Sequence, residues 1–256
     1  HPPSVDVRIG VPPLDAFAES MDPAARPVAD PATADQRWTI LYRVGSAAAL
    51  VTAAVIPIQI VVFLVWPPPL DGTAADWFAL FRDNRLVGLV DLDLLLAVDN
   101  ALAVLMLLAV YAALRRAAES VMAIAVTLGL ISAVMYIASN PAIGMARLSD
   151  QYAAATTDAQ RSAALAAGDA LLATWQGTAF HAAYLLGSVA GILIGLVMLR
   201  ASTFGTVTGS MAILGNGVGL GLYVPVVGVY IAVLSVVFLE VWYLLVARGL
   251  HRLERI

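Results

Sequence analysis

The sequence predicts an all-α protein built as a bundle of six transmembrane helices. Three observations lead to this prediction. Apolar runs of membrane-spanning length recur along the chain, hydrophobic residues make up 61% of it against 12% charged residues, and arginines stand at alternate ends of the runs. A soluble domain of this size needs far more polar surface than such a composition supplies. The composition therefore indicates a helical membrane protein.

The segment 1–37 is rich in proline, alanine and acidic residues and shows no hydrophobic periodicity. Such a composition predicts disorder. It also lacks the basic start and apolar core of a signal peptide. We expect translation to begin at Met21, and residues 38–256 to form the membrane domain.

The predicted spans are separated by residues that stop helices. Proline interrupts the helical hydrogen-bond ladder, and arginine ends an apolar run at the headgroup boundary. In chain order, the stops after the first five spans are Pro67, Arg115, Pro141, Arg200 and Pro225. Each span has the length needed to cross roughly 30 Å of hydrocarbon at about 1.5 Å per residue. The six spans cover 44–66, 89–114, 120–139, 176–199, 206–223 and 227–247.

A short helix is predicted in the loop between the third and fourth spans. Thr157 and Gln160 have the spacing of a capping box, in which each side chain bonds to the backbone N–H of the other residue. Because an alanine-rich stretch follows, we expect this helix to cover 158–173.

The arginine distribution predicts the orientation, because positive charge in short loops stays on the cytoplasmic side. Eight arginines flank the side of the two termini, and four flank the opposite side. Both termini are therefore expected in the cytoplasm, with the loops 67–88 and 140–175 outside. Trp66, Trp77 and Trp175 are expected to form an aromatic belt at the outer interface.

Glycines predict how the spans pack, since the close approach of helices in lipid depends on small residues. Gly187, Gly191 and Gly195 form two overlapping GxxxG motifs in the fourth span, and Gly217 and Gly221 lie in the fifth. We expect the fourth and fifth spans to pack closely through these residues.

Polar residues inside the spans are the candidates for function, because polar groups in hydrocarbon are costly. Measured along each helix from its arginine boundary, several fall in the outer third of the bundle, so we predict a ligand-binding pocket that faces outward. A hydrogen-bonded pair of Asp99 and His181 is feasible if the second and fourth spans are neighbours. The candidate ligand-binding residues are Gln59, Asp99, Asn100, Asn140, Gln176 and His181.

Carboxylates within or near the spans suggest two further kinds of chemistry. Asp99 and Glu240 lie roughly 24 and 12 Å above the arginine boundary at 1.5 Å per residue, too far apart for paired-carboxylate catalysis. They can instead be successive stations of a proton-linked pathway. Asp91 and Asp93 have the spacing of a DxD metal motif, but at the start of a helix we interpret them as a solvated first turn favoured by the helix dipole.

Several polar segments carry a family resemblance, among them SNPA, LSDQYAAATT, WQGTAFH and AILGNGVGLGLYVP. Over roughly residues 38–250, the chain resembles the bacterial multi-pass membrane proteins catalogued as domain of unknown function 4386. The resemblance implies a helical, multi-pass protein of the bacterial plasma membrane. It brings no activity, cofactor or catalytic residue with it.

Three functions follow from these residues. The favoured one is a non-enzymatic membrane protein whose outward-facing polar pocket binds a lipid, a small ligand or a partner protein. The alternative is a small permease or proton-linked carrier that uses Asp99 and Glu240. A further alternative is an intramembrane lipid enzyme in which Asp91, Asp93 and His181 hold a divalent ion.

The sequence also excludes some chemistry. It has no cysteine, so thiol catalysis and thiolate metal ligation are impossible. It contains no phosphate-binding glycine loop, no zinc-protease motif and no nucleophile elbow. We therefore expect no cofactor and no nucleic-acid partner. The expected partners are the membrane lipids that surround the helices.

Overall fold

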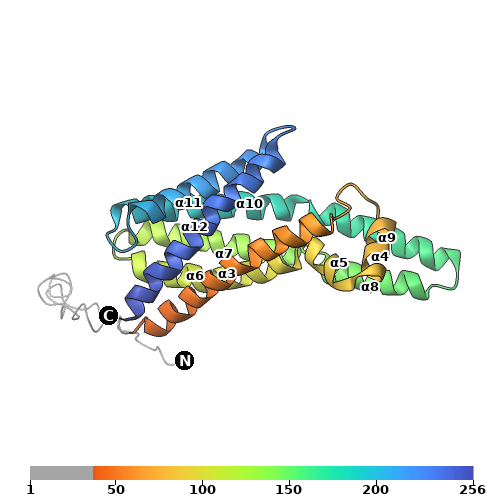
Figure 1. Ribbon diagram of the computed structural model, residues 1–256, viewed down its shortest axis with the longest axis horizontal. Coiled ribbons are helices and arrows are strands. Elements are labelled where there is room, and N and C mark those ends of the chain that lie inside the picture. Colours follow the sequence, from red (N-terminus) through yellow and green to blue (C-terminus); the bar gives the residue numbers. More distant parts are fainter. Residues whose placement is uncertain (1–36, 256) are drawn as a thin grey trace, which may run out of the picture. The chain divides into compact units, whose positions relative to one another are not determined.

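The computed structural model describes residues 37–255, apart from the side chain of Val229, and this part of the chain is all-α (Figure 1). The predictions of a disordered segment 1–37 and of a start at Met21 concern residues that, Arg37 excepted, lie outside this range. In chain order the helices are α3 (Thr39–Val65), α4 (Ala74–Asp83), α5 (Arg85–Asp91), α6 (Leu94–Leu114), α7 (Glu119–Ser139), α8 (Ala142–Ala154), α9 (Asp158–Trp175), α10 (Thr178–Arg200), α11 (Thr206–Gly219), the 3₁₀ turn η1 (Leu220–Tyr223) and α12 (Gly228–Glu254).

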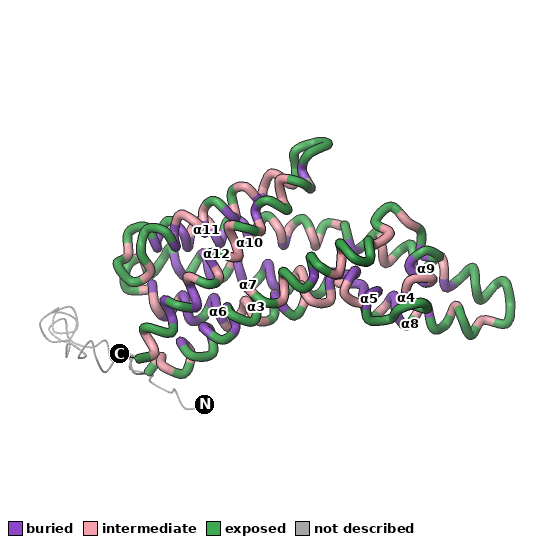
Figure 2. Tube along the Cα trace, in the orientation of Figure 1, coloured by how far each residue is buried: buried purple, intermediate pink, exposed green. Residues whose placement is uncertain are grey.

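Large apolar side chains are exposed along the long helices. Figure 2 shows many exposed residues, coloured green, in these helices. Leu64 is 76% exposed, and Val237 is 60% exposed. Apolar surface of this extent needs lipid rather than water around it. Within residues 37–255, five helical segments are long and apolar enough to cross a membrane, so the chain is a helical membrane protein. These segments are Thr39–Val65, Leu94–Leu114, Glu119–Ala154, Asp158–Arg200 and Tyr230–Glu254.

The predicted spans agree with the helices in four cases, namely α3, α7, α10 and α12, and differ in two. The predicted span 89–114 is divided into α5 and α6, because Asp93 has a left-handed backbone (φ 60°) that an α-helix cannot contain. The predicted span 206–223 consists of α11, which has only 14 residues, and η1. It is therefore not among the five segments of spanning length.

Six helices form a closed ring in which each helix packs against the next. The order of contact is α3, α6, α7, α10, α11 and α12, and α12 returns to α3. The start of α3 and the end of α12 lie at one end of the ring, which we call the base (Figure 1). There Arg43 forms an ion pair with Glu254 at 2.6 Å, and the Arg115 guanidinium lies over the ring of Trp38.

Within the ring, α10 and α11 meet at glycines. A Cβ atom on Gly195 would lie 2.8 Å from the carbonyl oxygen of Gly209, and one on Gly209 would lie 2.7 Å from the carbonyl oxygen of Gly195. Gly191 faces Asn216 of α11, whereas Gly187 faces α7. Because these distances are shorter than real Cβ contacts, only glycine permits this approach of the two backbones.

Gly217 does not take part in helix packing within the chain, contrary to the expectation from its spacing. A Cβ atom on Gly217 would have nothing within 4 Å, whereas one on Gly221 would clash with Ile231 of α12. The two glycines do not share a face because α11 passes into the tighter 3₁₀ turn between them, which changes the direction of successive side chains.

A separate apolar cluster lies at the end of the ring opposite the base, and we call its helices α4, α8 and α9 the cap (Figure 1). Trp77 and Trp175 meet there edge to face, with ring centroids 5.9 Å apart. Both are buried, so they do not form the expected aromatic belt, and only Trp66 of the three is exposed. Helices α4 and α8 were not predicted because their apolar residues serve a small packed core rather than a continuous span.

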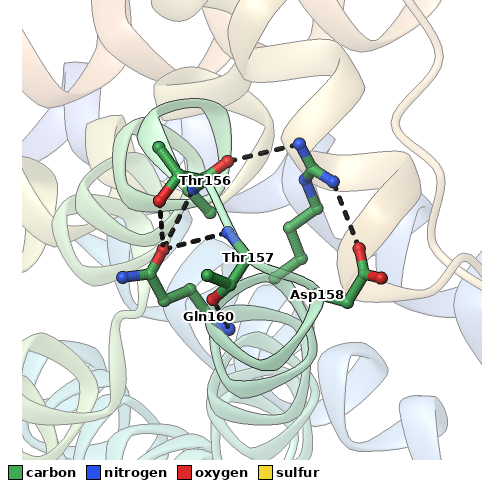
Figure 3. A network of polar contacts seen from close by, with 6 residues as sticks. Thr156, Thr157, Asp158 and Gln160 are labelled. Atoms are coloured by element: carbon green, nitrogen blue, oxygen red, sulfur yellow. Dashed lines mark hydrogen bonds and ion pairs between the residues drawn. The ribbon is translucent and has the colours of Figure 1, made fainter.

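Side-chain caps begin two of the cap helices. At the start of α9, the Gln160 side chain accepts hydrogen bonds from the N–H groups of Thr156 and Thr157, which confirms the predicted capping box (Figure 3). At the start of α4, the Asp76 carboxylate accepts from the N–H and the hydroxyl of Thr73 at 2.8 and 2.9 Å. These bonds lower the pKa of Asp76, because they favour the ionised carboxylate.

The glycine contact between α10 and α11 leads to a first prediction. Gly195→Ala should lower the free energy of unfolding by about 1 to 3 kcal/mol, because the new methyl group meets a backbone carbonyl that cannot move freely. Unfolding by sodium dodecyl sulfate in mixed micelles, followed by circular dichroism, measures this change. Gly217→Ala is the matched control and should leave the stability unchanged, since open space surrounds it. Equal effects of the two substitutions would contradict the packing described here.

Candidate functional site

A cavity of about 380 Å³ lies inside the ring, and all six ring helices contribute to its wall. We call it the central cavity. Its lining contains the carboxylates of Asp93 and Asp99 and the amides of Asn100 and Asn216, together with serine and tyrosine hydroxyls. Polar groups inside a lipid-embedded bundle are energetically costly, so their presence here indicates a functional site.

The central cavity separates two apolar regions. Along α6, Asp99 and Asn100 lie between Leu92, which belongs to the cap cluster, and Met106, which belongs to a larger cluster near the base. The base cluster draws residues from all six ring helices, including Ile194 of α10. The polar layer is therefore closed toward the base by packed side chains.

Asp93 stands at the head of α6 and is the most connected residue of the site. Its Oδ1 accepts a hydrogen bond from Gln59 Nε2 of α3 at 2.8 Å, and its Oδ2 accepts one from the indole N–H of Trp175 of α9 at 3.2 Å. Tyr136 of α7 also hydrogen bonds to this carboxylate. Burial raises the pKa of Asp93 to about 6, although these three hydrogen bonds oppose the rise.

Asp99 lies one and a half turns further along α6 and has fewer partners. It is 7% exposed, and Thr52 of α3 hydrogen bonds to it. Its Oδ1, however, is buried and has no hydrogen-bond partner among the described residues. An unpaired oxygen of a buried carboxylate in a cavity wall is a group that a ligand can satisfy.

Three hydroxyl groups of the cavity wall donate their hydrogens to backbone carbonyls. Ser132 donates to the carbonyl of Ala183 at 2.7 Å, and Tyr184 donates to that of Gly219 at 2.8 Å. Ser235 donates within its own helix at 2.6 Å. A hydroxyl has one hydrogen, so each of these groups presents only acceptor lone pairs to any further partner. These three hydroxyls therefore add acceptors, and no donors, to the wall.

A second cavity of about 390 Å³ lies at the cap side and shares Asp93 and Phe180 with the central cavity. We call it the mouth cavity. Trp175, Gln176 and His181 also line it. Phe180 packs against aromatic rings on both sides, so it stands at the junction of the two cavities.

The structure divides the predicted ligand-binding residues among three places. Asp99 and Asn100 line the central cavity, and Gln176 and His181 line the mouth cavity. The remaining two support the start of α6: Gln59 holds the Asp93 side chain, and the Asn140 amide donates to the carbonyl of Leu92 at 2.8 Å. The predicted set thus does not share one pocket.

The expected pair of Asp99 and His181 does not form. The His181 Nδ1 lies 3.3 Å from the Tyr223 hydroxyl on the mouth side, whereas Asp99 bonds to Thr52. The pairing was expected from depth alone, and depth does not tell which way a side chain points around its helix. Sequence reasoning also undervalued Asp93, whose neighbours Gln59 and Trp175 come from distant segments.

Asp91 and Asp93 do not form a solvated helix turn, because both are buried. The carboxylate oxygens of Asp91 have no hydrogen-bond partner among the described residues. Burial raises the pKa of Asp91, and the charge of Asp93 adds to this rise. Within residues 37–255, no three histidine, aspartate or glutamate side chains are placed to hold a metal ion. The hypothetical metal site of Asp91, Asp93 and His181 is therefore not formed.

Glu240 of α12 is the second carboxylate that the sequence placed inside a span. The two carboxylates are within electrostatic range of each other, and both influence Tyr243, which lines the central cavity. The Oε1 of Glu240 is buried and has no hydrogen-bond partner in the described part of the chain.

Comparisons of the chain with protein-family models, with curated proteins and with solved structures each find no match. The described part of the chain is a helical membrane protein with a cavity that is lined from all six ring helices.

The hydrogen bonds to Asp93 lead to a second prediction. Trp175→Phe keeps an aromatic ring against Trp77 but removes the indole donor, which leaves a buried carboxylate oxygen short of a partner. The free energy of unfolding should fall by about 1 to 3 kcal/mol. Detergent unfolding monitored by circular dichroism tests this, with Trp66→Phe as the control, because Trp66 is exposed. If both substitutions have the same small effect, Trp175 does not stabilise the carboxylate.

Proposed function

We propose that this protein is a non-enzymatic membrane protein that binds a small ligand in the central cavity and admits it through the mouth cavity. The observation that carries the proposal is the central cavity itself, lined from all six ring helices and bordered by an unpaired buried oxygen of Asp99. A volume of about 380 Å³ is in the range of cavities that hold small ligands. The packed base cluster supports entry from the cap side only.

The proposal includes six membrane crossings. With 14 residues in α11 and 4 in η1, the segment Thr206–Tyr223 spans roughly 29 Å at 1.5 and 2.0 Å per residue, close to the thickness of a hydrocarbon core. Its packing against α10 and α12 within the ring supports a crossing. Six crossings place both chain ends on the base side, whose arginines favour the cytoplasm. The mouth cavity then faces outward.

A bacterial plasma membrane is the proposed location, together with membership of the family catalogued as domain of unknown function 4386. Both rest on the resemblance of the polar segments described above. Since that family brings no activity with it, the binding function stands on the cavity alone. Membrane lipids and a small ligand are the proposed partners.

Cysteine labelling tests whether the central cavity is accessible, because the chain has no native cysteine. Ser188→Cys places a thiol in the cavity wall, Ala125→Cys places one in the base cluster, and Ser162→Cys places one on the exposed surface of α9. In detergent, the small neutral reagent methyl methanethiosulfonate should modify the thiols at positions 188 and 162. Its reaction with the thiol at position 125 should be at least tenfold slower. Equal protection of the cavity and core thiols would refute an accessible cavity.

A proton-linked carrier is a second candidate, and one observation favours it. Asp99, which lines the central cavity, and Glu240 interact electrostatically. Protons or cations passing between two acidic stations would use such an arrangement. This function further requires a path through the packed base cluster.

The carrier function is tested with reconstituted vesicles that contain a pH-sensitive dye. If the protein is a carrier, a cation gradient should drive proton movement, and Glu240→Gln should reduce the rate at least tenfold because it removes the inner station. Glu119→Gln is the control, since this exposed residue begins α7 at the base. If the unaltered protein moves no protons, the carrier function is refuted, and ligand binding is the one proposed function that remains.

A further inference from the structure

We infer that the ligand of the central cavity is a small organic cation, an amine that carries its proton at neutral pH. This inference rests on the proposed binding function and names the chemical class of its ligand. Three properties of the cavity wall support it independently: its charge, its excess of hydrogen-bond acceptors and its aromatic surface.

The charge of the cavity wall is entirely acidic. Asp93 and Asp99 line the cavity, and Glu240 lies within electrostatic range of Asp99. Among the described residues, no arginine and no histidine lines the central cavity, and the chain contains no lysine. An anionic ligand would meet only repulsion there. A cation would offset the cost of burying carboxylates in a medium of low polarity.

The acceptor excess favours a cation that donates hydrogen bonds. Three hydroxyl groups donate their hydrogens to backbone carbonyls, namely those of Ser132, Tyr184 and Ser235. The amides of Asn100 and Asn216 each use one N–H on a carbonyl four residues earlier in the same helix. An ammonium group offers up to three donors and needs acceptors only, so it complements this wall. The unpaired Oδ1 of Asp99 supplies the charged acceptor.

The aromatic surface favours an organic ligand over a metal ion. Tyr136, Phe180, Tyr184 and Tyr243 line the cavity, and the ring of Phe180 lies 6.2 Å from that of Tyr184 in a stacked arrangement. Aromatic faces attract cations and pack against hydrocarbon. A volume of about 380 Å³ is also far larger than a desolvated monatomic ion needs. An amine with a short apolar group fits all three properties.

Reagent charge provides the first test, on the Ser188→Cys protein. Aminoethyl methanethiosulfonate carries a primary ammonium group, and sulfonatoethyl methanethiosulfonate carries a sulfonate. After each rate is divided by the rate at the exposed Ser162→Cys thiol, the cationic reagent should react at least tenfold faster than the anionic one. Adding Asp99→Asn should reduce this ratio severalfold, whereas Asp71→Asn, which removes an exposed charge, should not change it.

Protection by free ligands provides the second test and needs no carboxylate variant. Phenethylamine should slow modification of Ser188→Cys by the neutral reagent, and phenethyl alcohol, its uncharged counterpart, should need at least a tenfold higher concentration. Equal protection by both compounds, or equal rates for the two charged reagents, would overturn the assignment of a cation and leave an accessible cavity intact. If the neutral reagent itself does not reach Ser188→Cys, the proposed binding function fails, and this inference fails with it.

Discussion

The buried carboxylate of Asp93 is the constraint on which the rest of the structure depends. A carboxylate in this position needs hydrogen-bond donors, and the donors come from three different helices: Gln59 on α3, Tyr136 on α7 and Trp175 on α9. The left-handed backbone of Asp93 separates α5 from α6, at the point where the chain returns from α4 and α5 to the ring. One residue thus fixes where two ring helices and the cap meet.

The same residue explains the layered organisation of the interior. Apolar packing closes the base, apolar packing forms the cap, and the carboxylates of Asp93 and Asp99 lie between them. Asp93 lies on the cap side of Asp99 and borders both the central cavity and the mouth cavity. Both oxygens of Asp93 are already hydrogen bonded, so this residue shapes the junction of the two cavities. Asp99 has an unpaired oxygen, so it is the group that remains for a ligand.

Much of the ring could be predicted from the sequence, because lipid imposes a strong and simple pattern. Long apolar runs predicted α3, α7, α10 and α12, and Thr157 with Gln160 predicted the start of α9. The glycines of α10 predicted its approach to α11 because only small residues permit it, although Gly217 shows that the spacing alone does not tell which glycine is in contact.

The cap and the site were less predictable, for a physical reason in each case. Helices α4 and α8 bury only one side against each other and α9, so neither has the continuous hydropathy of a span. The partners of Asp93 lie 34 and 82 residues away in sequence, and no local pattern records such a contact. Distance along a helix gave the depth of Glu240, but helix tilt and rotation decide what a side chain meets.

The closure of the ring has a consequence for the order of events during synthesis. Its last contact joins α12 to α3, the described helices most distant in sequence. Until α12 has been inserted, the acidic wall of α6 has an open flank toward lipid or toward unrelated proteins in the membrane. A nascent chain halted before α12 would therefore expose Asp99 without its enclosure, which makes such a chain a natural target for quality-control proteases that recognise misplaced charge in the bilayer.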